Sequence, residues 1–211
     1  MNNIKMVTKY LLLILIFTNT VSCRQSKLKV NYNFNKSLAD RLDSILTQDQ
    51  KYRQMLSSIE DKYGVKSKER ADFWKIINTE DSINKFKVIS ILDKHGWLGQ
   101  DVVGESGNSA LYLVIQHSDL KTQEKYLPMM REAVKNGKAL GSNLAYLEDR
   151  VALGNGKKQI YGSQLYRNDT TMVFYFAPIV DERNVNKRRA SVGLNTIEDR
   201  AREFGFEYEI H

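Results

Sequence analysis

Apolar residues recur at helical spacing through the first long segment of the chain after residue 36. Ser37 and Asp40 stand where a helix start is usually capped, and Gly64 is a natural stop. We therefore expect a first helix from about residue 37 to Gly64. The apolar side of this helix consists of Leu38, Leu42, Ile45, Leu46, Leu56 and Ile59.

A second helix is predicted from Ser67 to His95, with a break near Asn78 and Thr79. Glycines are frequent from residue 96 to residue 107, which predicts an irregular loop there. Residues 110–115 are apolar on every side. A helix of that kind is buried all round, so we expect it in the core.

Two further helices are bounded by capping residues and glycines. Ser118 or Asp119 can cap a helix that ends at Gly137, and Pro128 should bend this helix or mark its true start because proline has no N–H. Another helix is predicted over 142–153, closed by the glycines that follow it.

The hydrophobic period changes after residue 158. Residues 159–166 and 171–176 are rich in aromatic and β-branched side chains, and the turn-like segment 167–170 separates them, which predicts a β-hairpin. Short helices are expected at 185–190 and after Thr196, which opens a capping box. The predicted fold is α+β and mainly α: about five helices packed with a C-terminal β-hairpin, in a single globular domain from residue 37 to residue 211.

The first 22 residues have the order of a secretory signal peptide. Lys5 and Lys9 precede the apolar run 10–17, and small or polar residues lead to Cys23. The run is too short to span a bilayer as a helix, which needs about 20 apolar residues. We therefore expect residues 1–22 to be removed.

Cys23 is the only cysteine of the chain and stands at the expected cleavage site. The segment 20–23 resembles a bacterial lipobox, in which the cysteine is acylated, for example with palmitate. This predicts a lipoprotein of the cell envelope whose polar segment 23–36 is a lipidated tether to a membrane. Residues 24–27 contain no acidic cluster, which favours a periplasm-facing anchor. The alternative is an ordinary secretory signal with a free thiol.

The composition is that of a globular protein with a basic excess. Of the 211 residues, 42% are hydrophobic and 27% are charged, and the formal net charge is +7. A basic protein can bind nucleic acid, but an exported one seldom meets it, and acidic residues are interspersed through the chain. The one dense basic run, 187–189, is interpreted as a solvated helix face. We expect no nucleic-acid partner.

Charged residues interrupt the apolar side of the first helix. At 100° per residue, Asp49 and Arg53 project within about 40° of Leu42 and should point inward. Asp81, Asn84 and His95 do the same in the second helix. An isolated buried charge is unfavourable, so we expect Asp49 and Arg53 to pair with each other or with nearby groups. Either the pair fixes how the helix docks, or these residues line a polar pocket.

His117 directly follows the buried apolar helix, with Gln116 beside it. A histidine in such a place is commonly a core residue, but its near-neutral pKa makes it the best candidate for a general base. His95, His117 and His211 show no close metal-ligand spacing, and no nucleophile elbow, phosphate loop or dinucleotide fingerprint is present. We expect neither a metal nor another cofactor.

Six short motifs in order resemble DUF6624, an uncharacterised bacterial family. Leu98 and Ser163 stand where the family usually has proline and threonine, which loosens one turn and preserves one hydroxyl. The resemblance implies a polar centre that includes Asp49, Arg53, His117, Arg150, Gln159, Gln164 and Arg189, and it implies no reaction. The motifs are 49–53, 96–99 with 103–104, 116–117, 149–150, 159–164, and 181–189 with 193–194.

Three functions remain open. The first is binding of a small polar or anionic ligand or an envelope component by amide and guanidinium groups. The second is a hydrolase or transferase with His117 as general base and Asp49 to orient it. The third is a buried network that only specifies the fold. The candidate ligand-binding residues are Gln50, Arg53, Gln116, Arg150, Gln159, Gln164 and Arg189.

Overall fold

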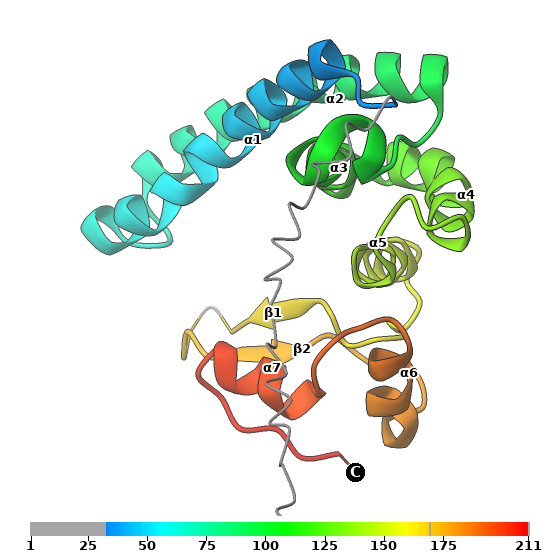
Figure 1. Ribbon diagram of the computed structural model, residues 1–211. Coiled ribbons are helices and arrows are strands. Elements are labelled where there is room, and N and C mark those ends of the chain that lie inside the picture. The colour runs from blue at the N-terminus through cyan, green and yellow to red at the C-terminus, as the bar shows by residue number, and fades with distance from the viewer. Residues whose placement is uncertain (1–32, 169, 211) are drawn as a thin grey trace, which may run out of the picture. The chain divides into compact units, whose positions relative to one another are not determined.

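The computed structural model describes residues 33–168 and 170–210 (Figure 1). The predicted signal peptide (1–22), Cys23 and residues 24–32 of the predicted tether lie outside the described residues. The described residues all belong to one of the two units into which the chain divides, residues 31–211. No helix among them is both long enough and apolar enough to span a membrane.

Two long helices, α1 (Lys36–Tyr63) and α2 (Lys68–His95), lie side by side and pack on α3 (Gln100–His117) (Figure 1). The start of α1 is capped by Asn35, whose side chain accepts a hydrogen bond from the N–H of Leu38 at 3.0 Å. The predicted capping residues, Ser37 and Asp40, lie inside the helix. Gly64 ends α1 as predicted. The predicted break in α2 near Asn78 is wrong, because α2 is continuous through this point.

The loop predicted from residue 96 to residue 107 is also wrong for most of its length. Helix α3 starts at Gln100, and only Gly104, with φ of 73°, departs from helical geometry. Gly107 serves close packing instead of loop flexibility, because a Cβ there would lie 2.9 Å from Cβ of Val103 and 3.4 Å from Cδ1 of Leu42. Glycine at this position lets α1 approach α3.

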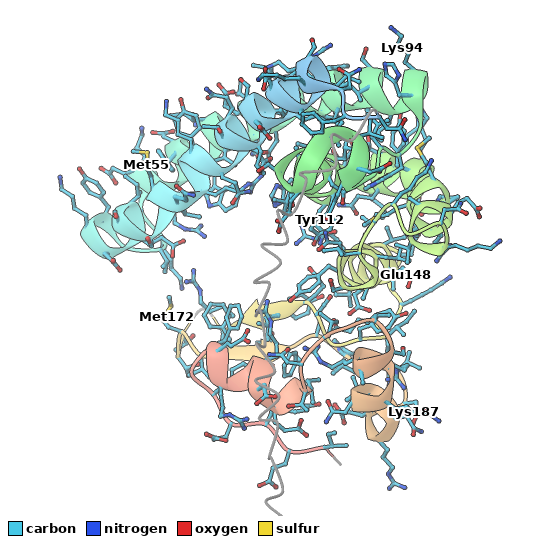
Figure 2. The ribbon with its side chains drawn as sticks, in the orientation of Figure 1. Met55, Lys94, Tyr112, Glu148, Met172 and Lys187 are labelled. Carbon is cyan, nitrogen blue, oxygen red and sulfur yellow. The ribbon has the colours of Figure 1, made fainter. Side chains whose placement is uncertain are left out.

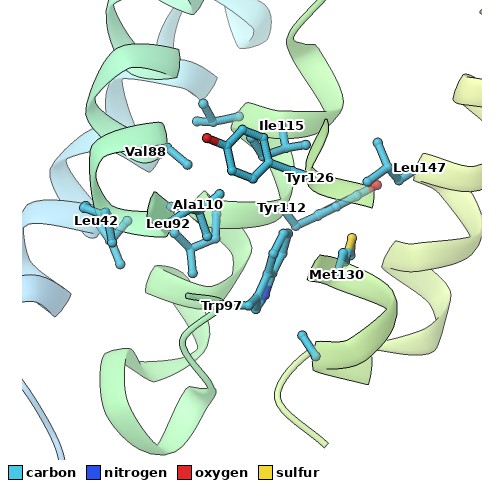
Figure 3. Close-up of a cluster of buried hydrophobic side chains, with 14 of the residues drawn as sticks. Leu42, Val88, Leu92, Trp97, Ala110, Tyr112, Ile115, Tyr126, Met130 and Leu147 are labelled. Atoms are coloured by element: carbon cyan, nitrogen blue, oxygen red, sulfur yellow. The ribbon is translucent and has the colours of Figure 1, made fainter. Parts of the chain in front are cut away.

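Helices α4 (Leu120–Lys135) and α5 (Gly141–Gly154) pack against each other and against α3. Asp119 caps α4, accepting from the N–H of Thr122 at 3.0 Å, and Pro128 lies inside the helix. Buried side chains of α1, α2, α3, α4 and α5 form the larger core (Figure 3). Its fully buried members include Leu42, Val88, Leu111, Ile115, Met130 and Leu147.

The C-terminal part contains an antiparallel hairpin of β1 (Leu165–Arg167) and β2 (Phe174–Phe176), as predicted, although both strands are shorter than the sequence indicated. A turn of 3₁₀-helix, η1 (Glu182–Asn184), precedes α6 (Val185–Ser191) and α7 (Ile197–Glu203). Thr196 caps α7 through the N–H of Asp199 at 3.2 Å, which confirms the predicted cap. Buried side chains of this part form a second, smaller core, which consists of Phe176, Ile179, Val185, Ile197 and Ala201. The predicted fold class is confirmed.

The basic run 187–189 is not a uniformly solvated face. Lys187 is exposed (Figure 2), but Arg189 is only 1% exposed. Arg188 donates to the carbonyl oxygen of Ile160 at 2.7 Å. The prediction was therefore wrong for Arg189, because its guanidinium finds backbone acceptors inside the domain.

Gly107→Ala should destabilise the domain by about 1–2 kcal/mol, because crowding against Val103 and Leu42 outweighs the higher helix propensity of alanine. Urea denaturation measures the change. Ser106→Ala, exposed on the same helix, is the control and should change the free energy of unfolding by less than about 0.5 kcal/mol. Equal stability of Gly107→Ala and wild type would contradict the close approach of α1 and α3.

Candidate functional site

Asp49 of α1 points inward as predicted and is 3% exposed. Both of its carboxylate oxygens lie 3.1 Å from Nδ1 of His117, the last residue of α3. The side-chain amide of Gln50 donates to Oδ2 at 2.7 Å. An ionised carboxylate is an acceptor only, so the neutral imidazole of His117 carries its proton on Nδ1 and leaves Nε2 as the acceptor.

Arg53 joins Asp49 to the second helix. Its Nε lies 3.7 Å from Oδ2 of Asp49, so the predicted pair forms. Its Nη2 donates to both carboxylate oxygens of Asp81, at 2.5 and 2.6 Å. The guanidinium is therefore shared between two acids from two helices. This arrangement offsets the cost of burying Asp49 next to the core.

Of the polar residues of α2 that were predicted to point inward, Asn84 is buried and His95 is not. Asn84 is fully buried, and neither atom of its amide has a hydrogen-bond partner among the described residues. His95, predicted to point inward with it, is exposed. His95 is the last residue of α2, and Leu92 and Trp97 take the buried positions at this end of the helix.

The pKa of the Asp49 carboxyl lies below its ordinary value. Burial acts to raise this pKa. The opposite effect is larger and comes from the hydrogen bond and charge of His117, the charge of Arg53 and the hydrogen bond from Gln50. Asp49 is therefore a carboxylate at neutral pH. In this state it fixes the tautomer and the orientation of the His117 ring.

His117 lines a pocket of about 190 Å³ at the surface, which we call the His117 pocket. Within the described parts of the chain, Nε2 of His117 has no hydrogen-bond partner. On the rim, Lys85 of α2 pairs with Asp119, the capping residue of α4, at 2.8 Å. The pocket is lined by Asn78, Asp81, Ser82, Lys85, His117, Ser118 and Asp119.

Asp49, Asp81 and His117 also form a candidate cation site, since each offers a ligand atom within 4.8 Å of the others. Sequence spacing did not indicate this cluster because its members come from three different helices. Two carboxylates and an imidazole would suit a divalent metal. Arg53, however, already contacts both acids, and a metal ion would have to displace it. The geometry therefore favours an acid–base centre.

The backbone next to His117 is held by two side chains from other helices. The carbonyl oxygen of Gln116 accepts from Nη1 of Arg150 at 3.1 Å and from Nε2 of Gln123 at 3.0 Å. Arg150 also donates from Nε and Nη2 to Oε1 of Gln164. Arg150, Gln116 and Gln164, all predicted site residues, thus meet at the end of α3. Gln123 was missed, because a single glutamine on an amphipathic helix carries no distinctive signal.

The side chains of Gln159 and Arg189, which were predicted to bind ligand, donate hydrogen bonds to backbone carbonyl oxygens of the domain. The amide of Gln159 donates to the carbonyl oxygens of Gln164 and Ala177 at 3.0 and 2.7 Å. Arg189 donates to the carbonyl oxygens of Tyr161 and Gly162 at 2.8 and 3.2 Å. Neither residue lines the His117 pocket. Their contacts indicate a structural role.

Asp149 of α5 also holds the segment 159–164, and we call Asp149, Gln159 and Arg189 together the clamp. Its carboxylate is fully buried and accepts from the N–H groups of Ile160, Tyr161 and Ser163 at 2.6, 3.0 and 2.9 Å. Burial raises the pKa of the Asp149 carboxyl above its ordinary value, although the three N–H donors act in the opposite direction. The clamp fixes Gln164, and through Gln164 it fixes Arg150.

The fold and the site define a mainly helical α+β domain in which a buried acid orients a histidine at the edge of a pocket. The chain belongs to the family of unknown function DUF6624, whose model matches residues 37–210. No curated protein and no solved structure matches the chain.

Asp49→Asn should lower the free energy of unfolding at pH 7 by about 1–3 kcal/mol, because charge-assisted hydrogen bonds are lost inside the protein. Since the pKa of Asp49 is lowered in the folded state, its stabilisation is present above the ordinary value of 3.8 and is lost as pH falls through the folded value. The difference between wild type and variant should therefore shrink at low pH.

Urea denaturation at several pH values measures this difference. Asp43→Asn, exposed on the same helix, is the matched control and should change the free energy of unfolding by less than about 0.5 kcal/mol. A cost of Asp49→Asn that stays constant down to acid pH would show that the charge of Asp49 does not stabilise the fold.

Proposed function

We propose that the domain binds a small polar ligand in the His117 pocket and that His117 acts on it as a general base, in a hydrolysis or group-transfer reaction. The observation that carries the proposal is the placement of the ring: Nδ1 lies 3.1 Å from both oxygens of buried Asp49, while the side chain lines the pocket. A positioned histidine of this kind is the commonest general base in enzymes.

The proton transfer is balanced within this pair. Nε2 accepts a proton from a water molecule or a substrate hydroxyl, and Nδ1 keeps its own proton in the hydrogen bond to Asp49. The Asp49 carboxylate then stabilises the imidazolium, as the acid of a catalytic triad does. The proton on Nε2 is later returned to the leaving group.

The hydroxyl groups of the pocket are engaged elsewhere. Ser118 donates to the carbonyl oxygen of Val114 at 2.7 Å, and Ser82 donates to that of Asn78 at 2.8 Å. Neither hydroxyl donates a hydrogen bond to His117. This favours activation of water or of a substrate hydroxyl over attack by a protein nucleophile.

Ligand binding without catalysis is the second candidate. The rim of the pocket combines the donors of Asn78 and Lys85 with the acceptors of Asp81 and Asp119. Such a mixture recognises hydroxyl and amide groups by hydrogen bonding. The two candidates differ in one respect: a binding protein needs the shape of the His117 side chain, and an enzyme needs its basic Nε2.

His117→Asn should lower turnover by a factor of about 10²–10⁴, which is the usual contribution of a general base. The probes are nitrophenyl esters, phosphates and glycosides together with peptidoglycan fragments, and a thermal-shift screen of sugars and peptides runs in parallel. His95→Asn, an exposed histidine on α2, is the control and should retain full activity. Ligand stabilisation that persists in His117→Asn without any turnover in wild type would favour the second candidate.

A second readout does not depend on the substrate. The ¹⁵N shifts of the neutral His117 ring should report a proton on Nδ1, and Asp49→Asn should abolish this preference. A neutral ring protonated on Nε2 in the wild type would contradict the proposed base.

We further propose that the protein is a lipoprotein anchored to a membrane of the cell envelope through acylated Cys23, with the domain facing the periplasm. The support is the charged, apolar, small-residue order of residues 1–22 and the lipobox-like segment that ends at Cys23. Two acyl chains suffice for stable anchoring.

Cys23→Ser should abolish incorporation of an alkyne-labelled palmitate in bacterial cells and move the protein from the membrane fraction to the soluble fraction. Ser22→Ala, which keeps the cysteine and a small residue before it, is the control and should still be labelled. Equal labelling of wild type and Cys23→Ser would rule out this anchor.

A further inference from the structure

Arg150 is a partly buried cation that has no acidic partner among the described residues. Its three hydrogen bonds go to neutral groups, the carbonyl oxygen of Gln116 and Oε1 of Gln164. Among the described residues, no carboxylate lies within 4.0 Å of its guanidinium, whereas Arg53 and Arg70 each have one at 2.5 Å. Burial lowers the pKa of Arg150, which shows that the charge is held at a cost.

The end of α3 compensates this charge only in part. A helix C-terminus carries about half a negative charge, and Gln116 lies in the last turn of α3. The nearby Tyr112 is a neutral hydroxyl at neutral pH, since burial raises its pKa. Figure 3 shows Tyr112 reaching from α3 toward Leu147 of α5. A net positive charge therefore remains at Arg150.

Arg53 adds a second positive charge near the same end of α3. Its Nε lies 3.7 Å from Asp49, which contacts His117, the neighbour of Gln116. Its charge acts to lower the pKa of Arg150. Two guanidinium groups near each other repel, and both residues are partly buried. Asp49 and Asp81 compensate the charge of Arg53, whereas Arg150 has no such acid among the described residues. Part of this repulsion would be relieved by an anion that contacts both groups.

Both guanidinium groups keep free donors. A guanidinium has five N–H groups, and the contacts of Arg150 use one on each nitrogen, which leaves one on Nη1 and one on Nη2. In the described part of the chain, Nη1 of Arg53 donates to nothing, and its buried Nε has no hydrogen-bond partner. Paired terminal N–H groups match the oxygens of a carboxylate or a phosphate.

We propose that Arg53 and Arg150 together bind an oxyanion of the ligand, a carboxylate or a phosphate group, beside His117. This inference rests on the proposed function for the ligand that carries the oxyanion. It adds the chemical class of that ligand and assigns its recognition to residues on α1 and α5. Gln164 and Gln116 hold Arg150 in place and leave its free donors available.

Anion binding is measured on the purified protein by thermal shift and calorimetry at constant ionic strength. Inorganic phosphate and acetate are the probes, and chloride is the reference. Either probe should stabilise the wild type beyond chloride, and the stronger of the two distinguishes phosphate from carboxylate recognition. Arg150→Gln should weaken the affinity for that probe at least tenfold.

The matched control is Arg131→Gln, a half-exposed arginine on α4 that pairs with Glu148 and should bind the probe as the wild type does. Arg150→Lys keeps the charge but loses the paired donors, so it should bind the probe more weakly than the wild type. It also provides a folded variant if Arg150→Gln does not fold. No stabilisation beyond chloride, or unchanged affinity in both Arg150 variants, would overturn the proposal.

His117→Asn separates this proposal from the proposed function. It should bind phosphate or acetate like the wild type, because it removes no guanidinium. Turnover that depends on His117 in a protein that binds neither probe would refute the oxyanion site alone. Anion binding that depends on Arg150, without turnover, would refute the general base alone.

Discussion

A carboxylate placed in the middle of an apolar helix face is the constraint on which the site depends. Asp49 lies on the same side of α1 as Leu42 and Ile45, and all three are at most 3% exposed. A charge in this position must be compensated, and its partners come from the same helix and from the end of α3: Gln50, Arg53 and His117. Arg53 in turn engages Asp81 of α2. One buried carboxylate therefore fixes how three helices meet.

The helical part of the fold could be predicted because its signals are local. Periodicity placed α1, α2, α4 and α5, and capping residues such as Ser67, Asp119 and Thr196 mark helix starts where the sequence indicated. The loop predicted around Gly107 failed because its reason is not local. Gly107 resembles a loop residue until its close approach to Leu42 of α1, which is distant in sequence, is known.

The site was predictable in its residue types but not in its grouping. Periodicity showed that Asp49 and Arg53 face inward, and it could not show that Asp81 and His117 would meet them. His95 satisfied the same periodicity and is exposed, because a helical position indicates a direction and not whether anything covers it. A buried polar residue is likewise ambiguous from sequence. Gln159 and Arg189 had the same signal as Gln164, yet their hydrogen bonds go to backbone groups of the domain.

The clamp around segment 159–164 and the network around Asp49 have different roles. Asp149, Gln159 and Arg189 satisfy backbone groups of the segment 159–164, which forms only one isolated bridge, between Gln159 and Ile179, in place of a regular strand. Gln164 belongs to that segment and accepts a hydrogen bond from Arg150. The clamp therefore also restricts the position of the Arg150 side chain. The network around Asp49 has the opposite character, because Nε2 of His117 and terminal N–H groups of Arg53 remain unused within the described residues. A polar network that serves only the fold is expected to satisfy its members fully. Several of the unused groups lie around the end of α3, which supports the proposal that the ligand binds there and not at the clamp.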